Sequence, residues 1–213
     1  ITALIRPSAG TVTNAPVVYT SGTNLTSATA GAQEYDGTVF YGTAQSSQRG
    51  VMPTEHFIVL TTDYVGSDVA TAQSVFNSPA SGTITLPAST SYFLEAVYYI
   101  TRAAGTTSHT LSTLFTLGGT LTSITYTADT TSTTGNALGA VSRIYATGAT
   151  AAVVTAASTT ATENITVVIR GVIRTNTAGS FTPQIQYSAA PGGAPTILTN
   201  SYLRLIPIGT NTV

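Results

Sequence analysis

Cysteine, lysine and tryptophan do not occur in this sequence, and charged residues of any kind are rare. The absence of cysteine excludes a disulfide framework, a cysteine-ligated zinc site and a thiol nucleophile. The absence of lysine leaves seven arginines as the only permanently basic residues, and the formal net charge is −1. Such a chain has no basic field with which to neutralise phosphates, so we expect no nucleic-acid partner.

Long apolar runs are also missing. No stretch approaches the roughly 20 apolar residues that a membrane helix needs, so we expect no membrane insertion.

Charged residues make up 7 % of the chain, against about 25 % in an average domain, while threonine alone supplies about a fifth of the residues. A surface kept soluble by hydroxyls suits a protein packed in an assembly better than a freely diffusing enzyme. The first residue is isoleucine, so we expect a fragment or a processed chain.

What the sequence has instead is a series of short runs rich in threonine, valine and tyrosine, which favour extended structure. The runs are 56–62, 82–86, 91–101, 109–117, 121–128, 137–147, 151–156, 163–175, 180–188 and 202–208. Their spacing of about 10–15 residues predicts an all-β chain with an antiparallel, jelly-roll-like β-sandwich. Helical periodicity is scarce: the best candidate, residues 68–76, is at most two turns long. Residues 129–139 are predicted to be a polar loop.

Two of the predicted strands, 91–101 and 163–175, are apolar on both faces. Alternate residues face the core, because neighbours in a strand point to opposite sides of the sheet. The inward sets are Tyr92, Leu94, Ala96, Tyr98 and Ile100 in the first strand and Ile165, Val167, Ile169, Gly171 and Ile173 in the second. A two-layer sandwich buries one face per sheet, so the outward set would leave a large apolar patch in water. We therefore predict an oligomer interface made by Phe93, Val97, Tyr99, Val168 and Val172.

Residues 16–50 differ from the rest in being polar and rich in turns. Asp36-Gly37 stands between β-prone neighbours, which is a strong hairpin signal because glycine adopts positive φ at little cost. A single hairpin is only marginally stable, so this segment needs a partner surface, from its own chain or from other copies. We predict two parts: an extended or hairpin appendage over residues 1–50 and the β-sandwich over residues 51–213.

The amino-acid sequences of several segments, and the order in which they follow one another, resemble a known group of proteins. SGTNLTSATAGAQEYDGTVFYGT is followed by HFIVLTTDY, AQSVFN, GTITLPASTSYFLEAVYYIT and AGTTSHTLSTLFTLGGTLTSITYTA, and later by FTPQIQYSAAP and SYLRLIPIGTNTV. This succession resembles the C-terminal region of bacteriophage tail-fibre proteins, the receptor-binding appendages of the virion. The resemblance implies a homotrimer with a jelly-roll-like end domain, assembled in the host cytoplasm and located in the phage particle. Its expected partners are further copies of itself, other virion proteins and a host surface polysaccharide.

The histidines do not belong to a recognisable catalytic or metal site. Glu55 and His56 are neighbours in a strand, so their side chains point to opposite faces and cannot act together. His109 has no second ligand at a metal-binding spacing. We expect His109 at a surface or an interface, and a loop-edge or hydrogen-bonding role for Glu55 and His56.

The carboxylates give no stronger signal. Glu95 lies among aromatic residues and, if buried, needs a salt-bridge partner such as Arg102, Arg170 or Arg204. Asp36-Gly37 lacks the alternating ligands and the later glutamate of an EF-hand calcium loop, so Asp36 is predicted to be a turn residue. Nucleophile-elbow, phosphate-loop and dinucleotide fingerprints are absent. We expect no catalytic residues, no cofactor and no metal, and therefore no enzyme.

The aromatic residues leave three functional interpretations open. Eleven tyrosines occur without tryptophan; exposed tyrosines could stack on sugar rings, but packing in the core and at interfaces is the favoured role. The leading hypothesis is a structural component of a phage virion, a trimeric tail fibre or receptor-binding appendage. A capsid decoration (cement) or head-fibre protein is the first alternative. A carbohydrate-binding module is an alternative of another class, which a monomeric mass in solution would favour.

Overall fold

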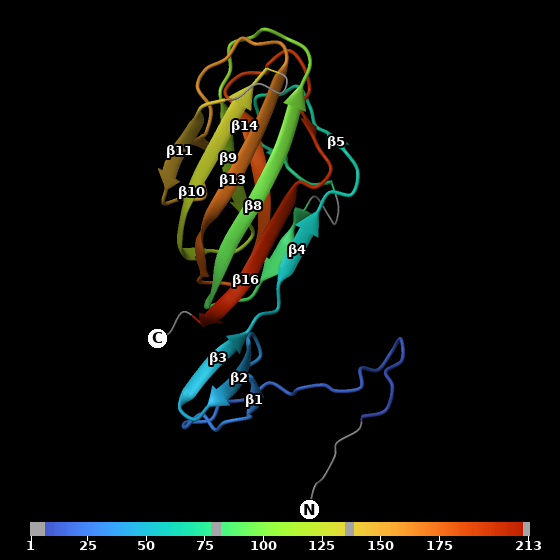
Figure 1. Cartoon of the computed structure of the whole chain (residues 1–213), viewed down its shortest axis with the longest axis vertical. Coiled ribbons are helices and arrows are strands. Elements are labelled where there is room, and N and C mark those ends of the chain that lie inside the picture. The colour runs from blue at the N-terminus through green and yellow to red at the C-terminus, as the bar shows by residue number, and fades with distance from the viewer. Residues whose placement is uncertain (1–6, 78–81, 135–138, 211–213) are drawn as a thin grey trace, which may run out of the picture. The chain divides into compact units, whose positions relative to one another are not determined.

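The computed structural model describes residues 7–77, 82–134 and 139–210. Every element named in this part of the chain is a β-strand, and all of the strand pairings are antiparallel (Figure 1). This confirms the predicted all-β, antiparallel class. The chain divides into two compact units, Ile1–Met52 and Pro53–Val213.

The first unit contains a small antiparallel meander of three strands, β1 (Gln33–Tyr35), β2 (Phe40–Gln45) and β3 (Gln48–Met52). The Asp-Gly pair closes the predicted hairpin between β1 and β2. Asp36 Oδ1 accepts the backbone N–H groups of Thr38 and Val39, both at 2.8 Å. Gly37 has a φ of 99°, which glycine adopts without strain. Asp36 therefore acts as a turn residue.

The larger sheet of the second unit is built around one long strand, β8 (Thr90–Arg102) (Figure 1). On one side β8 pairs along nearly its whole length with β13 (Glu163–Thr175). On the other side its first half pairs with β16 (Tyr202–Thr210) and its end with β15 (Thr196–Ile197). The sheet continues through β10 (Leu121–Thr133) and β11 (Val141–Ala146) beyond β13, through β4 (His56–Val59) beyond β16, and through β5 (Tyr64–Val65) beyond β15.

The smaller sheet has the order β12-β9-β14-β6, and β7 also pairs with β14. Its strands are β12 (Ala152–Val153), β9 (Leu111–Leu117), β14 (Gly179–Tyr187), β6 (Gln73–Ser74) and β7 (Ile84–Leu86). From β7 onward the chain passes repeatedly between the two sheets, because β8, β10, β13 and β16 belong to the larger one. Most strand pairs are therefore formed between segments far apart in the sequence.

The core lies between the two sheets and draws all of its members from the second unit. The predicted inward residues of β8 are at most 2 % exposed, and Ile165, Val167, Ile169 and Ile173 of β13 at most 3 %. From the smaller sheet, the stacked rings of Phe115 and Phe181 have centroids 4.9 Å apart. Phe115 also meets Tyr126 of β10 edge to face at 5.4 Å. The period-2 assignment of inward faces is confirmed.

The short helix predicted for residues 68–76 is wrong. Strand β6 lies there and pairs with β14. The Gln73 side chain bonds both backbone groups of Ser67, at 2.8 and 3.1 Å, and Val75 and Phe76 are fully buried. So short a segment cannot recover the cost of helix nucleation, whereas strand pairing and burial stabilise it in extended form.

The polar loop predicted for residues 129–139 is wrong in its first half, and residues 135–138 lie outside the described residues. β10 continues to Thr133, and Thr130 is paired with Ser142 of β11 and with Val167 of β13. Threonine is β-branched and fits a strand that is paired on both sides. The loop was predicted because the segment is rich in hydroxyl-bearing residues, and that composition did not indicate the pairing.

Candidate functional site

The outer face of the larger sheet carries the five residues predicted as an oligomer interface. Directly paired residues lie on the same face of a sheet. Val172, Phe93 and Ile206 are opposite one another across β13, β8 and β16, and Val168, Val97 and Tyr202 form a second row. The apolar and aromatic side chains of this face, here called the outer patch, are Phe57, Val59, Phe93, Val97, Tyr99, Val168, Val172, Tyr202 and Ile206.

Much of the outer patch is open to solvent. Phe57 and Phe93 are 56 % and 53 % exposed, and Tyr99 is 38 % exposed. Val168 and Val172 are half-buried. Val97 departs from the expectation, because it is only 8 % exposed. It lies in the second row, between Val168 of β13 and Tyr202 of β16. The surface of the patch is therefore made mainly by the aromatic side chains.

A groove of about 460 Å³ lies within the outer patch. Phe93, Val172 and Ile206 form its apolar wall. A row of charged residues crosses the groove: in the strand register, Glu95 of β8 lies opposite Arg170 of β13 on one side and opposite Arg204 of β16 on the other. The groove thus combines an apolar surface with charges of both signs, as the centre and the edge of a protein–protein interface do.

Glu95 does not form the salt bridge expected of a buried carboxylate. It is half-buried, and Tyr202 Oη donates a hydrogen bond to its Oε1 at 2.7 Å. This hydrogen bond, with burial, raises the pKa of Tyr202 to about 12. Arg204 instead holds Glu55 through bonds of 2.8 and 2.6 Å, and this pairing lowers the pKa of Glu55. The outer patch is therefore bordered by an exposed ion pair.

Glu55 and His56 point to opposite faces, as predicted. Glu55 meets Arg204 on the outer side, whereas the His56 ring lies 6.3 Å from that of the buried Tyr92. Partial burial lowers the pKa of His56. Neither residue contributes to a shared catalytic geometry.

His109 is buried, so its predicted surface position is wrong. It is 3 % exposed and joins Arg102 and Glu163, which are also buried. Arg102 Nη2 donates to Glu163 Oε2 at 2.9 Å, and His109 Nε2 lies 3.0 Å from the same oxygen. Arg102 also donates to the carbonyls of Ala104, Gly105 and Thr160. We call Arg102, His109 and Glu163 the buried cluster.

The hydrogen bonds of the buried cluster satisfy its charges. His109 Nδ1 lies 2.7 Å from the Thr107 carbonyl oxygen, and Arg102 Nη2 lies 3.5 Å from His109 Nε2, so the ring is held from both of its nitrogens. Burial acts to raise the pKa of Glu163, but hydrogen bonds from Ser158, Arg102 and His109 outweigh it and hold that pKa below its usual range. Glu163 is the only acidic residue after Asp129, a signal that could have identified it as a partner for a buried base.

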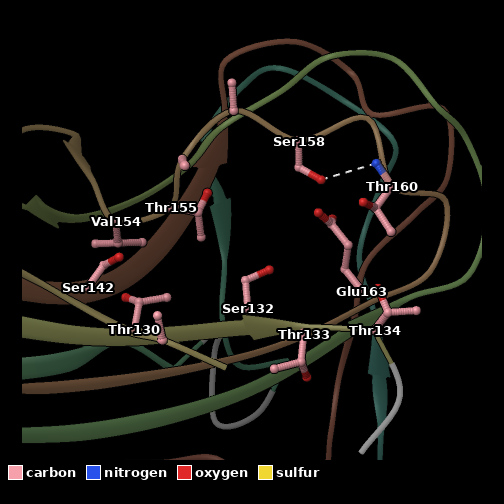
Figure 2. A pocket seen from close by; sticks show the side chains of 13 residues that line it. Thr130, Ser132, Thr133, Thr134, Ser142, Val154, Thr155, Ser158, Thr160 and Glu163 are labelled. Atoms are coloured by element: carbon pink, nitrogen blue, oxygen red, sulfur yellow. Dashed lines mark hydrogen bonds between the residues drawn. The ribbon is translucent and has the colours of Figure 1, made fainter. Parts of the chain in front are cut away.

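A polar cavity of about 330 Å³ adjoins the buried cluster (Figure 2). It lies beside the β10–β11 pair and the segment between β12 and β13, and we call it the polar pocket. Its hydroxyl-bearing lining residues are Thr130, Ser132, Thr133, Thr134, Ser142, Thr155, Ser158 and Thr160. Glu163 forms part of its wall, and Val154 is the largest apolar side chain among its described lining residues.

Other kinds of site find no support in the described part of the chain. Across residues 7–77, 82–134 and 139–210, His, Asp and Glu side chains do not gather in groups of three that could hold a metal ion. The same residues include no helix long and apolar enough to cross a membrane.

Comparison with known proteins gives no relative: the chain matches no protein-family model, no curated protein and no solved structure.

Proposed function

We propose that this chain is a structural, self-assembling protein of a bacteriophage particle, a homotrimeric tail fibre or receptor-binding appendage without enzymatic activity. The observation that carries the proposal is the outer patch. A monomer would keep Phe57 and Phe93 more than half exposed on one continuous sheet face. Contiguous apolar patches of this kind mark interaction sites, and burial between copies would remove them from water.

The scarcity of charged residues also favours association between copies of the chain. Only 7 % of the residues are charged and the net charge is −1, so repulsion between copies is weak. The charges that border the patch are of both signs, with Arg170 and Arg204 on either side of Glu95. Identical copies could therefore meet across this face without placing like charges together.

A jelly-roll topology is the finer proposal for the sandwich. Each sheet contains a row of four neighbouring strands, β4-β16-β8-β13 in the eight-stranded sheet and β7-β14-β9-β12 in the five-stranded sheet. The β10–β11 hairpin extends the first row beyond β13, and the short strands β5, β6 and β15 complete the two sheets. Double sheets of eight strands are typical of jelly rolls, which recur in viral capsid and lectin domains. A shared fold does not by itself assign a function, so the topology supports the proposal without carrying it.

The first unit also favours assembly. Among its described residues, only Val39 and Tyr41 are buried hydrophobic side chains, while Val18 is 79 % exposed. So small a core rarely supports a fold without a staple or oligomerisation. Further copies of the same unit would supply the missing burial. The number three itself rests on the resemblance to tail-fibre proteins.

The test is the mass of the full chain in solution, measured by light scattering at micromolar concentration. We expect three times the mass of one chain. Phe93→Glu places a charge in the middle of the outer patch and should yield monomers. Thr85→Glu is the control, because Thr85 is exposed on β7 of the smaller sheet. A monomeric wild type, or equal masses for both variants, would contradict the proposal.

The alternative of a capsid decoration or head-fibre protein shares the same self-association. It differs in where the chain resides in the virion. Immunogold labelling of intact particles separates the two: label at the tail tip supports the appendage, and label over the head supports the alternative.

A further inference from the structure

We propose that the polar pocket binds a neutral polyhydroxylated molecule, the terminal residue of a saccharide. The pocket lies in another part of the sandwich from the outer patch and shares no lining residue with it. The inference therefore adds a binding site that self-assembly does not require. It rests on the lining chemistry, on an unpartnered buried hydroxyl and on an anchored carboxylate.

The lining chemistry selects the class of ligand. Serine and threonine hydroxyls each donate and accept hydrogen bonds, which matches the alternating donors and acceptors of a sugar. Figure 2 shows Ser132, Ser142, Thr155 and Ser158 around one hollow, from three separate segments. Among the described lining residues there is no lysine, arginine or histidine, so these residues offer an anion no counter-charge. A volume of about 330 Å³ lies in the range of small-ligand pockets, but most such pockets are apolar.

Thr130 gives the second observation. It lines the pocket from the inner side of β10 and is only 2 % exposed. Its Oγ1 is buried and has no hydrogen-bond partner among the described residues. Buried polar atoms normally have a partner, and each exception needs an explanation. A ligand hydroxyl in the pocket would supply the missing partner.

Glu163 gives the third observation. Its Oε2 is held by Arg102 at 2.9 Å and by His109 at 3.0 Å, so the carboxylate is fixed in place. The residue also forms part of the pocket wall and faces Ser158 in Figure 2. Ser158 also donates a hydrogen bond to this carboxylate, so a sugar hydroxyl would share the carboxylate with Ser158; an ionised carboxylate has two acceptor oxygens and is a strong acceptor. The positive charge of Arg102, which is bonded to the same carboxylate, disfavours a metal cation there. A neutral hydrogen-bond donor is therefore the ligand that fits.

Saturation-transfer NMR with the full chain tests the inference. The probes are D-glucose, D-galactose, L-rhamnose and N-acetyl-D-glucosamine, each at millimolar concentration, with inorganic phosphate as a negative control observed by phosphorus line width. We expect transfer to at least one sugar and no broadening of phosphate. Transfer to none of the four sugars would overturn the proposal.

Two variants localise the binding. Thr130→Val removes the unpartnered hydroxyl while keeping the side-chain shape, so it should fold with an equal or higher melting temperature and bind the sugar about tenfold more weakly. Thr85→Val is the matched control and should bind as the wild type does. Equal binding by the Thr130 and Thr85 variants would place the sugar elsewhere and overturn the site. Ser142→Ala, at the β11 wall, should weaken binding as well.

The mass measurement keeps this inference separate from the proposed function. A trimer that binds none of the sugars would overturn the pocket alone. A monomer that binds a sugar through Thr130 would overturn the assembly alone.

Discussion

At the residue scale, the core of the sandwich buries a tyrosine, Tyr98, whose hydroxyl group makes no hydrogen bond with the described residues. Burial raises the pKa of this phenol, and the nearby Tyr126 adds to the shift. Because an unpartnered buried hydroxyl costs free energy, the ring of Tyr98, rather than its oxygen, contributes to stability.

Tyr98→Phe is therefore expected to leave the free energy of unfolding unchanged or to raise it by about 1 kcal/mol. Tyr202→Phe is the control, because its hydroxyl donates to Glu95 and its loss should destabilise the protein. Urea denaturation followed by circular dichroism measures both. A Tyr98 variant less stable than the Tyr202 variant would show that the buried hydroxyl has a partner.

The buried cluster makes a second prediction at this scale. Arg102→Ala leaves Glu163 buried without its guanidinium partner, and breaking a buried pair costs about 3–5 kcal/mol. Arg143→Ala removes the exposed pair of Arg143 with Asp129, whose Nη2–Oδ2 distance is 2.8 Å, and should have a much smaller effect because exposed pairs are screened by solvent. Thermal unfolding of the two variants is the measurement. Equal losses of stability would contradict the structural role of the cluster.

At the element scale, β10 and β13 approach each other closely at one point. Gly171 is paired with Tyr126, and a Cβ atom added to Gly171 would lie 2.5 Å from Tyr126 Cβ. The Thr125 carbonyl oxygen and Tyr126 Cα also lie within 3 Å of that position, so the backbone of β10 leaves no room for a side chain at this inward position of an otherwise Ile- and Val-rich strand. Strand contact, not backbone conformation, requires the glycine here.

Gly171→Ala is accordingly expected to destabilise the sandwich by about 1–3 kcal/mol through overpacking. Gly50→Ala in β3 is the control, because a Cβ atom there would meet its nearest neighbour, the Gly42 carbonyl oxygen, at an ordinary 3.7 Å. Chemical denaturation compares the two variants with the wild type. A Gly171 variant as stable as the Gly50 variant would mean that the β10–β13 pair can move apart without cost.

At the scale of the whole molecule, the two units differ in how much core each possesses. The core cluster runs from Ile58 to Leu205 and includes residues of both sheets. The described part of the first unit has only Val39 and Tyr41 as buried hydrophobic side chains. Stability of the two units should therefore be unequal.

A chain restricted to residues 53–213 is expected to keep its β-sheet circular dichroism spectrum and a cooperative thermal transition, since its core is complete. Residues 1–52 alone should give a spectrum without a cooperative transition at low concentration. Loss of cooperative unfolding by the 53–213 chain would show that the first unit contributes to the folding of the sandwich.

Period-2 alternation was sufficient to identify the fold class and the inward faces. The alternating residues of β8 and β13 are buried where the pattern placed them, because a strand's geometry fixes the direction of each side chain locally. The hairpin at Asp36-Gly37 is similarly local. The predicted helix at residues 68–76 was wrong, and the predicted loop at 129–139 was wrong up to Thr133, because pairing with distant strands overrode the local composition.

The sequence by itself determined the β class and the inward and outward sets of the two long strands, since each follows from periodicity within one segment. The pairing of β16 with β8 and β4 added Phe57, Val59, Tyr202 and Ile206 to the outer patch. Only the tertiary structure decided which distant residues meet. Glu163 lies 61 residues from Arg102 and 54 from His109, and the polar pocket joins β10, β11 and the segment before β13. Such contacts depend on the order and register of strands far apart in the chain, which no local pattern encodes.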